Sequence, residues 1–252
     1  MFVLALDSAT LAASAAVITA EKLVAERFIN NKLTHSETLL PIIQQVLVDA
    51  GITPQNLGGI AVTCGPGSFT GLRIGLATAK GLAQVLECPL VGIPTLDALA
   101  FNLVGNKGLI CPILDARKQQ VYTALYSTNP GESGLTAGLP LRPALQRLNE
   151  YQALSINELI CLLDKYAEQG SVTFLGDGVA VYAQALQHSL GDRALMASRA
   201  LNYPRAAAVA ELGLARITAG EDDHWSKLNA LYLRASEAET TWAKKHGCGK
   251  ER

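Results

Sequence analysis

The residues of this sequence that could do chemistry are carboxylates at the ends of apolar runs. Asp7 closes the run 2–6, and Asp115 closes the run 109–114. If the two aspartates face each other across a cleft between two lobes, they could hold a magnesium ion that carries a phosphate. Aspartate at the end of a strand also caps turns in the ordinary way. Both interpretations stay open from the residues alone.

A glycine turn follows the apolar run 59–64 and invites a phosphate-loop interpretation. Gly65 and Gly67 fit such a loop, but the third glycine is Gly71, one position later than a dinucleotide motif requires. A nucleophile elbow would need glycines two residues before and two residues after Ser68, and these are absent. The four histidines are never four residues apart, so no helical metal pair is expected. We expect no catalytic residue and no metal site.

Two helices are predicted around this turn. Thr34 and Glu37 form a capping box, which predicts a helix over 35–49. Ser68 is the expected N-cap of a second helix, over 69–86. Small residues recur every four positions on this second helix and therefore share one face: Gly71, Gly75, Ala79 and Ala83. Such a face allows close approach of another backbone, and the pattern alone favours an element of the same lobe.

Composition indicates a folded α/β protein rather than a disordered or coiled chain. Of the 252 residues, 49% are hydrophobic and 17% are charged. The net charge of −1 provides no broad attraction to nucleic acid. Five widely spaced cysteines without a C-x-x-C pair argue against disulfides and zinc, and favour the cytoplasm. No stretch is long and apolar enough for a membrane span.

The order of predicted elements suggests two lobes. An antiparallel meander (2–29) precedes a strand–helix–strand unit (59–93), and a similar series with its own terminal aspartate starts at residue 109, which hints at a duplication. We expect an N-terminal lobe over 1–103, a C-terminal lobe over 104–237 and a polar, basic tail over 238–252. A late helix, 205–220, could pack back on the first lobe.

Several motifs resemble one family when they are taken together. They are Leu4-Ala5-Leu6-Asp7-Ser8-Ala9-Thr10, His35-Ser36-Glu37, the run 65–75, Asp115-Ala116-Arg117, Gly176-Asp177-Gly178 and Tyr232-Leu233-Arg234. These residues resemble the TsaB family, also called YeaZ, from Phe2 to about Glu237. The resemblance implies a two-lobed fold of the actin, hexokinase and Hsp70 (ASKHA) type with a degenerate nucleotide site.

The same resemblance implies a function. The family takes part in installing N6-threonylcarbamoyladenosine (t6A) at position 37 of tRNAs that read codons beginning with A. It implies a non-catalytic subunit that pairs with a TsaD-like transferase, is joined by a TsaE-like ATPase, and forms a homodimer when alone. Contact with tRNA is expected only within the complex, and no contact with membrane. No cofactor is expected, and ATP binding should be weak or absent.

Comparison with the TsaD pattern supports a silent cleft. Thr95 and Leu99 stand where TsaD-like proteins carry two metal-binding histidines, and Leu11-Ala12 replaces an acidic pair. The long side chains of residues 117–119 stand where glycines would let backbone amides approach a phosphate. The expected vestigial nucleotide cleft consists of Asp7, Ser8, Thr10, Asp115, Gly176 and Asp177.

The resemblance places the two predicted helices in an intersubunit bundle. The expected partner interface consists of His35, Leu39, Leu40, Ile43, Val46, Phe69, Leu72, Arg73, Gly75, Leu76, Ala79 and Lys80. On this view, Leu39→Arg, Ile43→Arg or Ala79→Glu should abolish pairing and leave the monomer folded.

Two other functions stay open at this point. Asp7, Asp115 and the turn 176–178 would suit an active ATPase or sugar kinase. Ser68 and His35 would suit a peptidase that acts on the paralogue.

Overall fold

A mixed sheet forms the first lobe, with the strand order β3-β2-β1-β4-β5. The computed structural model describes residues 1–31, 33–133 and 143–234. The strands of this sheet are β1 (Phe2–Asp7), β2 (Ala13–Ile18), β3 (Leu23–Ile29), β4 (Leu57–Gly65) and β5 (Leu90–Pro94). β1, β2 and β3 form the predicted antiparallel meander, whereas β4 and β5 run parallel to β1. The carboxyl ends of β1 and β4 therefore meet at one edge of the sheet.

The second lobe repeats this connectivity with the order β10-β7-β6-β11-β12. Its strands are β6 (Leu109–Asp115), β7 (Gln120–Thr123), β10 (Gln152–Ser155), β11 (Val172–Leu175) and β12 (Ala194–Met196). β7 and β10 are antiparallel neighbours, and β11 and β12 run parallel to β6, as in the first sheet. The shared topology agrees with the duplication that the two terminal aspartates suggest.

An additional hairpin departs from the sequence prediction. The single strand expected over 120–126 is divided into β7 and β8 (Tyr126–Ser133), and β8 pairs with β9 (Pro143–Arg147). The expected irregular connection thus contains strand residues at both ends. The predicted basic tail lies outside the described residues.

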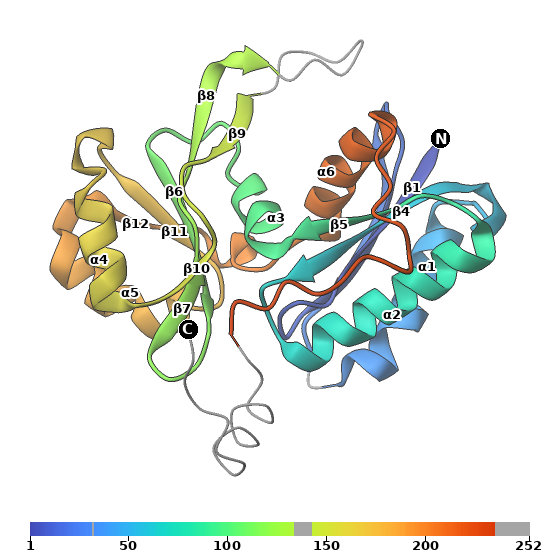
Figure 1. Cartoon of the computed structure of the whole chain (residues 1–252), viewed down its shortest axis with the longest axis horizontal. Coiled ribbons are helices and arrows are strands. Elements are labelled where there is room, and N and C mark those ends of the chain that lie inside the picture. Colours follow the sequence, from blue (N-terminus) through green and yellow to red (C-terminus); the bar gives the residue numbers. More distant parts are fainter. Residues whose placement is uncertain (32, 134–142, 235–252) are drawn as a thin grey trace.

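Helices cover both faces of the first sheet (Figure 1). α1 (His35–Asp49) and α2 (Phe69–Leu86) lie on one face and α6 (Ala206–Thr218) on the other, because alternate β1 side chains point to opposite faces. α3 (Thr95–Phe101) contacts β6 as well as β4 and β5, and so lies between the lobes. The second sheet carries α4 (Ile156–Asp164) and α5 (Val179–Leu190), of which the sequence analysis predicted only the first. Short 3-10 helices lie at Pro54–Asn56, Ala167–Gln169, Gly191–Arg193 and Arg199–Leu201.

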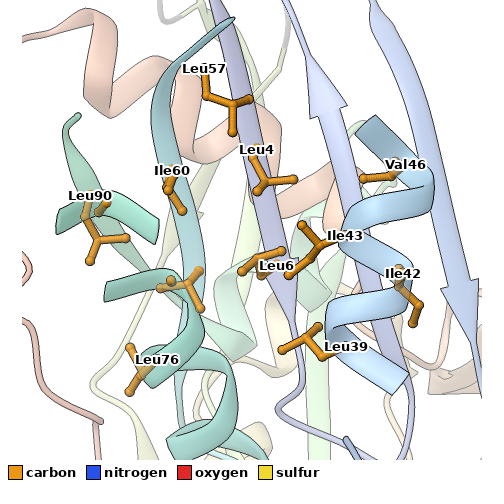
Figure 2. Packing of buried hydrophobic residues seen from close by; sticks show 14 of the residues in the cluster. Leu4, Leu6, Leu39, Ile42, Ile43, Val46, Leu57, Ile60, Leu76 and Leu90 are labelled. Carbon is orange, nitrogen blue, oxygen red and sulfur yellow. The ribbon is translucent and has the colours of Figure 1, made fainter. Parts of the chain in front are cut away.

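The core of the first lobe lies between α1, α2 and the sheet. Figure 2 shows Leu39 and Ile43 of α1 directed at Leu6 of β1. The capping box at Thr34 is formed, and Ser68 Oγ accepts a hydrogen bond from the Gly71 N–H, so both predicted helix starts are confirmed. These caps satisfy amides of the first helical turn.

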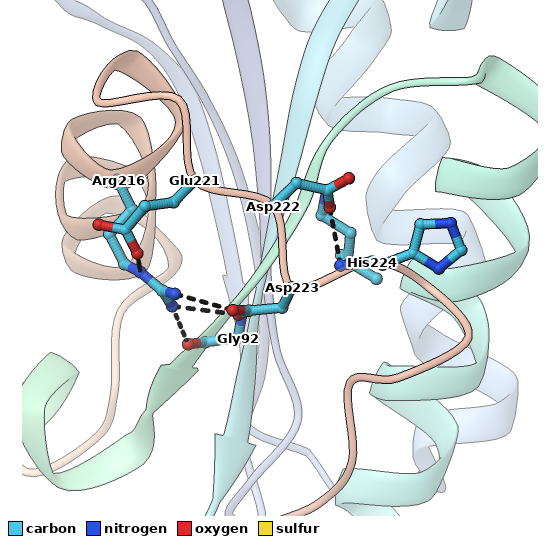
Figure 3. A network of polar contacts seen from close by, with 7 residues as sticks. Gly92, Arg216, Glu221, Asp222, Asp223 and His224 are labelled. Carbon is cyan, nitrogen blue, oxygen red and sulfur yellow. Dashed lines mark hydrogen bonds and ion pairs between the residues drawn. The ribbon is translucent and has the colours of Figure 1, made fainter.

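The segment 221–234 follows α6 and runs along the first lobe; we call it the strap. Asp223 accepts a hydrogen bond from the Gly92 N–H and donates its own N–H to the Leu90 carbonyl, so the strap covers the open edge of β5. Arg216 of α6 forms ion pairs with Glu221 and Asp223, and also donates to the Gly92 carbonyl (Figure 3). α6 and the strap belong in space to the first lobe, although they lie late in the sequence.

Candidate partner interface and nucleotide cleft

The small-residue face of α2 packs inside its own lobe. A Cβ atom at Gly71 would lie less than 3.0 Å from the Ser8 carbonyl oxygen, and one at Gly75 less than 3.0 Å from Ser8 Oγ. Ser8 Oγ also donates a 2.9 Å hydrogen bond to the Gly71 carbonyl. The backbone that this face approaches is therefore the β1–β2 turn, as the pattern alone favoured.

Half of the predicted interface belongs to the core, which corrects the sequence analysis. These residues are buried against the sheet or the β1–β2 turn: Leu39, Ile43, Val46, Leu72, Gly75, Leu76 and Ala79. A charged side chain at Leu39, Ile43 or Ala79 would have no route to water, so it would unfold the lobe rather than act only on pairing. The expected separation of pairing from folding is wrong for these three substitutions.

The opposite sides of α1 and α2 are exposed and partly apolar. Leu33, Leu40 and Val48 are 56%, 53% and 69% exposed, and Val85 of α2 is 81% exposed. Arg73, Ala77, Gly81 and Val85 form a second row at four-residue spacing, and all four are exposed. We call the exposed residues Leu33, Leu40, Val48, Arg73, Ala77, Gly81 and Val85 the outer face. Sequence analysis included only Leu40 and Arg73, although the same spacing could have revealed the second row.

Aromatic contacts fix the start of α2 to the strap. The rings of Phe69 and Tyr232 stack with their centroids 4.2 Å apart, and the Arg73 guanidinium lies 4.3 Å from the Phe69 centroid. Arg73 Nε also donates to Tyr232 Oη at 3.3 Å. Lys80 is half-buried on the same helix. Three of the predicted interface residues thus remain at least partly accessible on α2.

His35 and Ser68 do not form a catalytic pair. His35 Nε2 lies 2.7 Å from the Thr10 carbonyl, so its ring ties α1 to the β1–β2 turn. Ser68 Oγ accepts from the Gly71 N–H. Each group is engaged with backbone, and nothing in the described residues activates the serine as a nucleophile.

Asp7 is fully buried at the end of β1. Its Oδ1 accepts hydrogen bonds from Thr63 Oγ1 at 2.8 Å and from the Ala9 N–H at 3.3 Å, whereas Oδ2 has no partner. Burial raises the pKa of Asp7 to about 7, and the two hydrogen bonds only partly oppose that rise. A carboxyl group that is often neutral near pH 7 is a poor ligand for magnesium.

The other half of the predicted cleft surrounds the end of β6. The Asp115 N–H donates to Asp177 Oδ1 at 2.9 Å, and burial raises the pKa of Asp177. A Cβ atom at Gly176 would lie less than 3.0 Å from the Ile113 carbonyl oxygen, so glycine is required there by packing. The structure thus brings Asp115, Gly176 and Asp177 together, and separately Asp7, Ser8 and Thr10.

The turn between β6 and β7 has an unusual backbone. Arg117, Lys118 and Gln119 have φ values of 62°, 53° and 59°, and all three are exposed. A non-glycine residue in this left-handed region costs about 1–2 kcal/mol. Long side chains therefore occupy the predicted phosphate loop at an energetic cost.

Similarity to known proteins agrees with this architecture. The chain is 33% identical over 242 residues to the tRNA threonylcarbamoyladenosine biosynthesis protein TsaB of Bacillus subtilis (strain 168), across 96% of the chain and 98% of that protein. The chain belongs to the TsaB family. The protein of the same name from Haemophilus influenzae is 29% identical over 250 residues, across 97% of each. A family model described as TsaD: tRNA N6-adenosine threonylcarbamoyltransferase matches residues 22–242.

A solved TsaB-family structure confirms the fold. YeaZ from Pseudomonas aeruginosa superposes with a TM-score of 0.72 and 26% identity, covering 92% of this chain and 99% of that one. The two-lobed α/β fold of the actin and hexokinase type is thus the one predicted. Thr95 and Leu99, at the positions compared with TsaD histidines, are both fully buried. Within residues 1–31, 33–133 and 143–234, no helix could span a bilayer and no cluster of three potential metal ligands occurs.

Proposed function

We propose that this chain is a non-catalytic scaffold subunit for t6A synthesis on tRNA, and that its outer face docks a TsaD-like transferase. The observation that carries the proposal is the outer face itself. An exposed glycine in a helix costs about 1 kcal/mol relative to alanine, and a Cβ atom at Gly81 would contact nothing within 4 Å. Nothing within the described part of the chain requires glycine there, whereas a closely approaching partner helix would.

The apolar side chains around Gly81 support the same surface. Leu40 and Val85 project from adjacent helices, and Arg73 and Tyr232 provide polar groups at its margin. An apolar centre with a polar margin is typical of a protein–protein interface. In the absence of the transferase, the same face would pair two copies of the chain.

The cleft supports a non-catalytic role. Asp7 is buried and often neutral, and the cationic side chains of Arg117 and Lys118 replace a glycine loop. We infer that ATP binds weakly or not at all, and that a TsaE-like ATPase and the transferase supply the chemistry. tRNA would then contact this chain within the cytoplasmic complex.

The test separates pairing from folding by using Gly81→Arg. Arginine is a better helix former than glycine, so the isolated chain should unfold at a slightly higher temperature. Co-purification with a TsaD-like transferase should fall at least tenfold, because the long side chain blocks close approach. Leu40→Glu should act in the same direction.

Val181→Arg serves as the control, because Val181 is an exposed apolar residue on α5 of the other lobe. It should leave pairing unchanged. Normal co-purification of Gly81→Arg and Leu40→Glu would contradict the proposal. Tight binding and turnover of magnesium ATP by the isolated chain would contradict the non-catalytic role.

A further inference from the structure

The turn 117–119 between β6 and β7 holds two cations outward. Three successive non-glycine residues adopt left-handed backbone there, and their side chains are exposed, so packing of those side chains does not compensate for the strain. Hydrogen bonds at the base of the turn fix it instead. The Arg117 N–H donates to Asp115 Oδ1 at 2.9 Å, and Ala116 and Gln120 bond across the hairpin. The turn therefore presents Arg117 and Lys118 in a defined position.

The carboxylates nearest this turn are engaged with backbone amides. Asp115 accepts from the Arg117 N–H, and Asp177 accepts from the Asp115 N–H. Neither Arg117 nor Lys118 forms an ion pair within residues 1–31, 33–133 and 143–234. A third cation, Arg234 of the strap, donates its Nη1 to the Ala116 carbonyl at 2.9 Å. Positive charge thus gathers on the outside of the turn, in a chain whose net charge is −1.

Two tyrosines lie beside these cations. The charge of Arg234 acts on Tyr122 and opposes the rise in its pKa that burial causes. The charge of Asp115 acts on Tyr182 of α5, so that ring is close to the turn as well. Both side chains are half-buried, and neither hydroxyl forms a hydrogen bond with the described part of the chain. Cations beside accessible aromatic rings suit a nucleic acid, which offers phosphates and base faces.

We propose that Arg117 and Lys118 contact backbone phosphates of RNA, with Tyr122 and Tyr182 alongside. This inference rests on the proposed function, which brings a tRNA to the complex. A nucleoside triphosphate fits the turn less well, because long side chains occupy the positions where glycines would let backbone amides surround a phosphate. RNA phosphates can instead be reached from outside by extended arginine and lysine side chains.

The test uses Arg117→Gly/Lys118→Gly in the full chain and an unmodified tRNA transcript as the probe. Glycine removes the charges and relaxes the left-handed backbone, so the variant should melt a few degrees higher than the natural chain. Fluorescence anisotropy in 50–200 mM salt should show about tenfold weaker tRNA binding. The slope of log K against log salt should become shallower by roughly 1.5, as expected for two lost phosphate contacts.

Two variants serve as controls. Gln119→Gly relaxes the same turn and keeps both cations, so tRNA binding should stay within twofold. Lys107→Ser removes an exposed cation just before β6, at the end of the strand away from the turn, and should also have little effect. Magnesium ATP should not displace the tRNA.

Unchanged tRNA binding by Arg117→Gly/Lys118→Gly would overturn the proposal, as would absence of binding by the natural chain. Displacement of tRNA by ATP, together with loss of ATP binding in the double variant, would identify a nucleotide site instead. Loss of transferase pairing with normal tRNA binding would identify a protein contact. Gly81→Arg should leave tRNA binding intact, so the two proposals can fail separately.

Discussion

The first turn of each lobe follows a strand that ends in aspartate, yet the two turns have opposite environments. Ser8 and Thr10, after β1, are buried beneath α2 and held by His35. Arg117 and Lys118, after β6, are exposed in left-handed backbone. The two sheets share one connectivity, so the difference comes from what covers each turn. The glycine face of α2 covers the first turn.

This difference suggests a division of labour between duplicated halves. In the first lobe, the former ligand-facing turn has become part of the packing that supports α1 and α2. In the second lobe, the equivalent turn remains at the surface with two unpaired cations. The predictions below test this contrast, from the largest expected effect to the smallest.

Asp7→Asn should produce the largest effect, and its sign depends on pH. The native Asp7 keeps its proton up to a pKa of about 7, whereas in the unfolded chain the value is 3.8. As pH rises between these values, the unfolded chain releases a proton that the native chain retains, so this group lowers the free energy of unfolding. The interval corresponds to on the order of 4 kcal/mol.

Asparagine keeps an oxygen for Thr63 and cannot ionise. Urea denaturation between pH 4 and 8 should therefore show the variant gaining stability relative to the natural chain, with a plateau above pH 7. Asp164→Asn, at an exposed position, controls for the loss of a carboxylate. Parallel pH curves for Asp7→Asn and the natural chain would show that Asp7 is not buried as a neutral group.

Alanine substitutions on α2 should have opposite signs on its two sides. Gly71→Ala forces a Cβ atom against the Ser8 carbonyl, and overpacking of this kind costs about 1–3 kcal/mol. Gly81→Ala meets open space and should stabilise the chain by up to about 1 kcal/mol. Thermal unfolding of both variants measures the contrast. Equal effects would show that the inner face is not closely packed.

Ser8→Ala should give the smallest effect. It makes the first turn resemble the second, in which the residue after the aspartate is Ala116, and removes the bond from Ser8 Oγ to the Gly71 carbonyl. The expected loss is about 1 kcal/mol of unfolding free energy. Ser36→Ala, at an exposed serine, should change stability less, and equal losses in the two variants would contradict the contrast.

Local signals in the sequence predicted much of the fold. The caps at Thr34 and Ser68 and the alternation in the first strands located α1, α2 and the meander. The assignment of the two sides of α2 failed, because the four-residue spacing of Gly71 and Gly75 shows that something approaches closely but not what. Whether Ser8 or a partner lies there depends on tertiary packing. The left-handed turn 117–119 contains no glycine, so no residue type announced it.

Because α6 and the strap complete the first lobe, that lobe depends on the end of the chain. During synthesis, residues 1–103 emerge first, but the face of β1 covered by α6 and the edge of β5 covered by the strap wait for residues 206–234. At 5–20 residues per second, the delay is on the order of ten seconds. An uncovered edge strand can pair with other chains. The nascent first lobe should therefore be a client of ribosome-associated chaperones until the strap has left the exit tunnel.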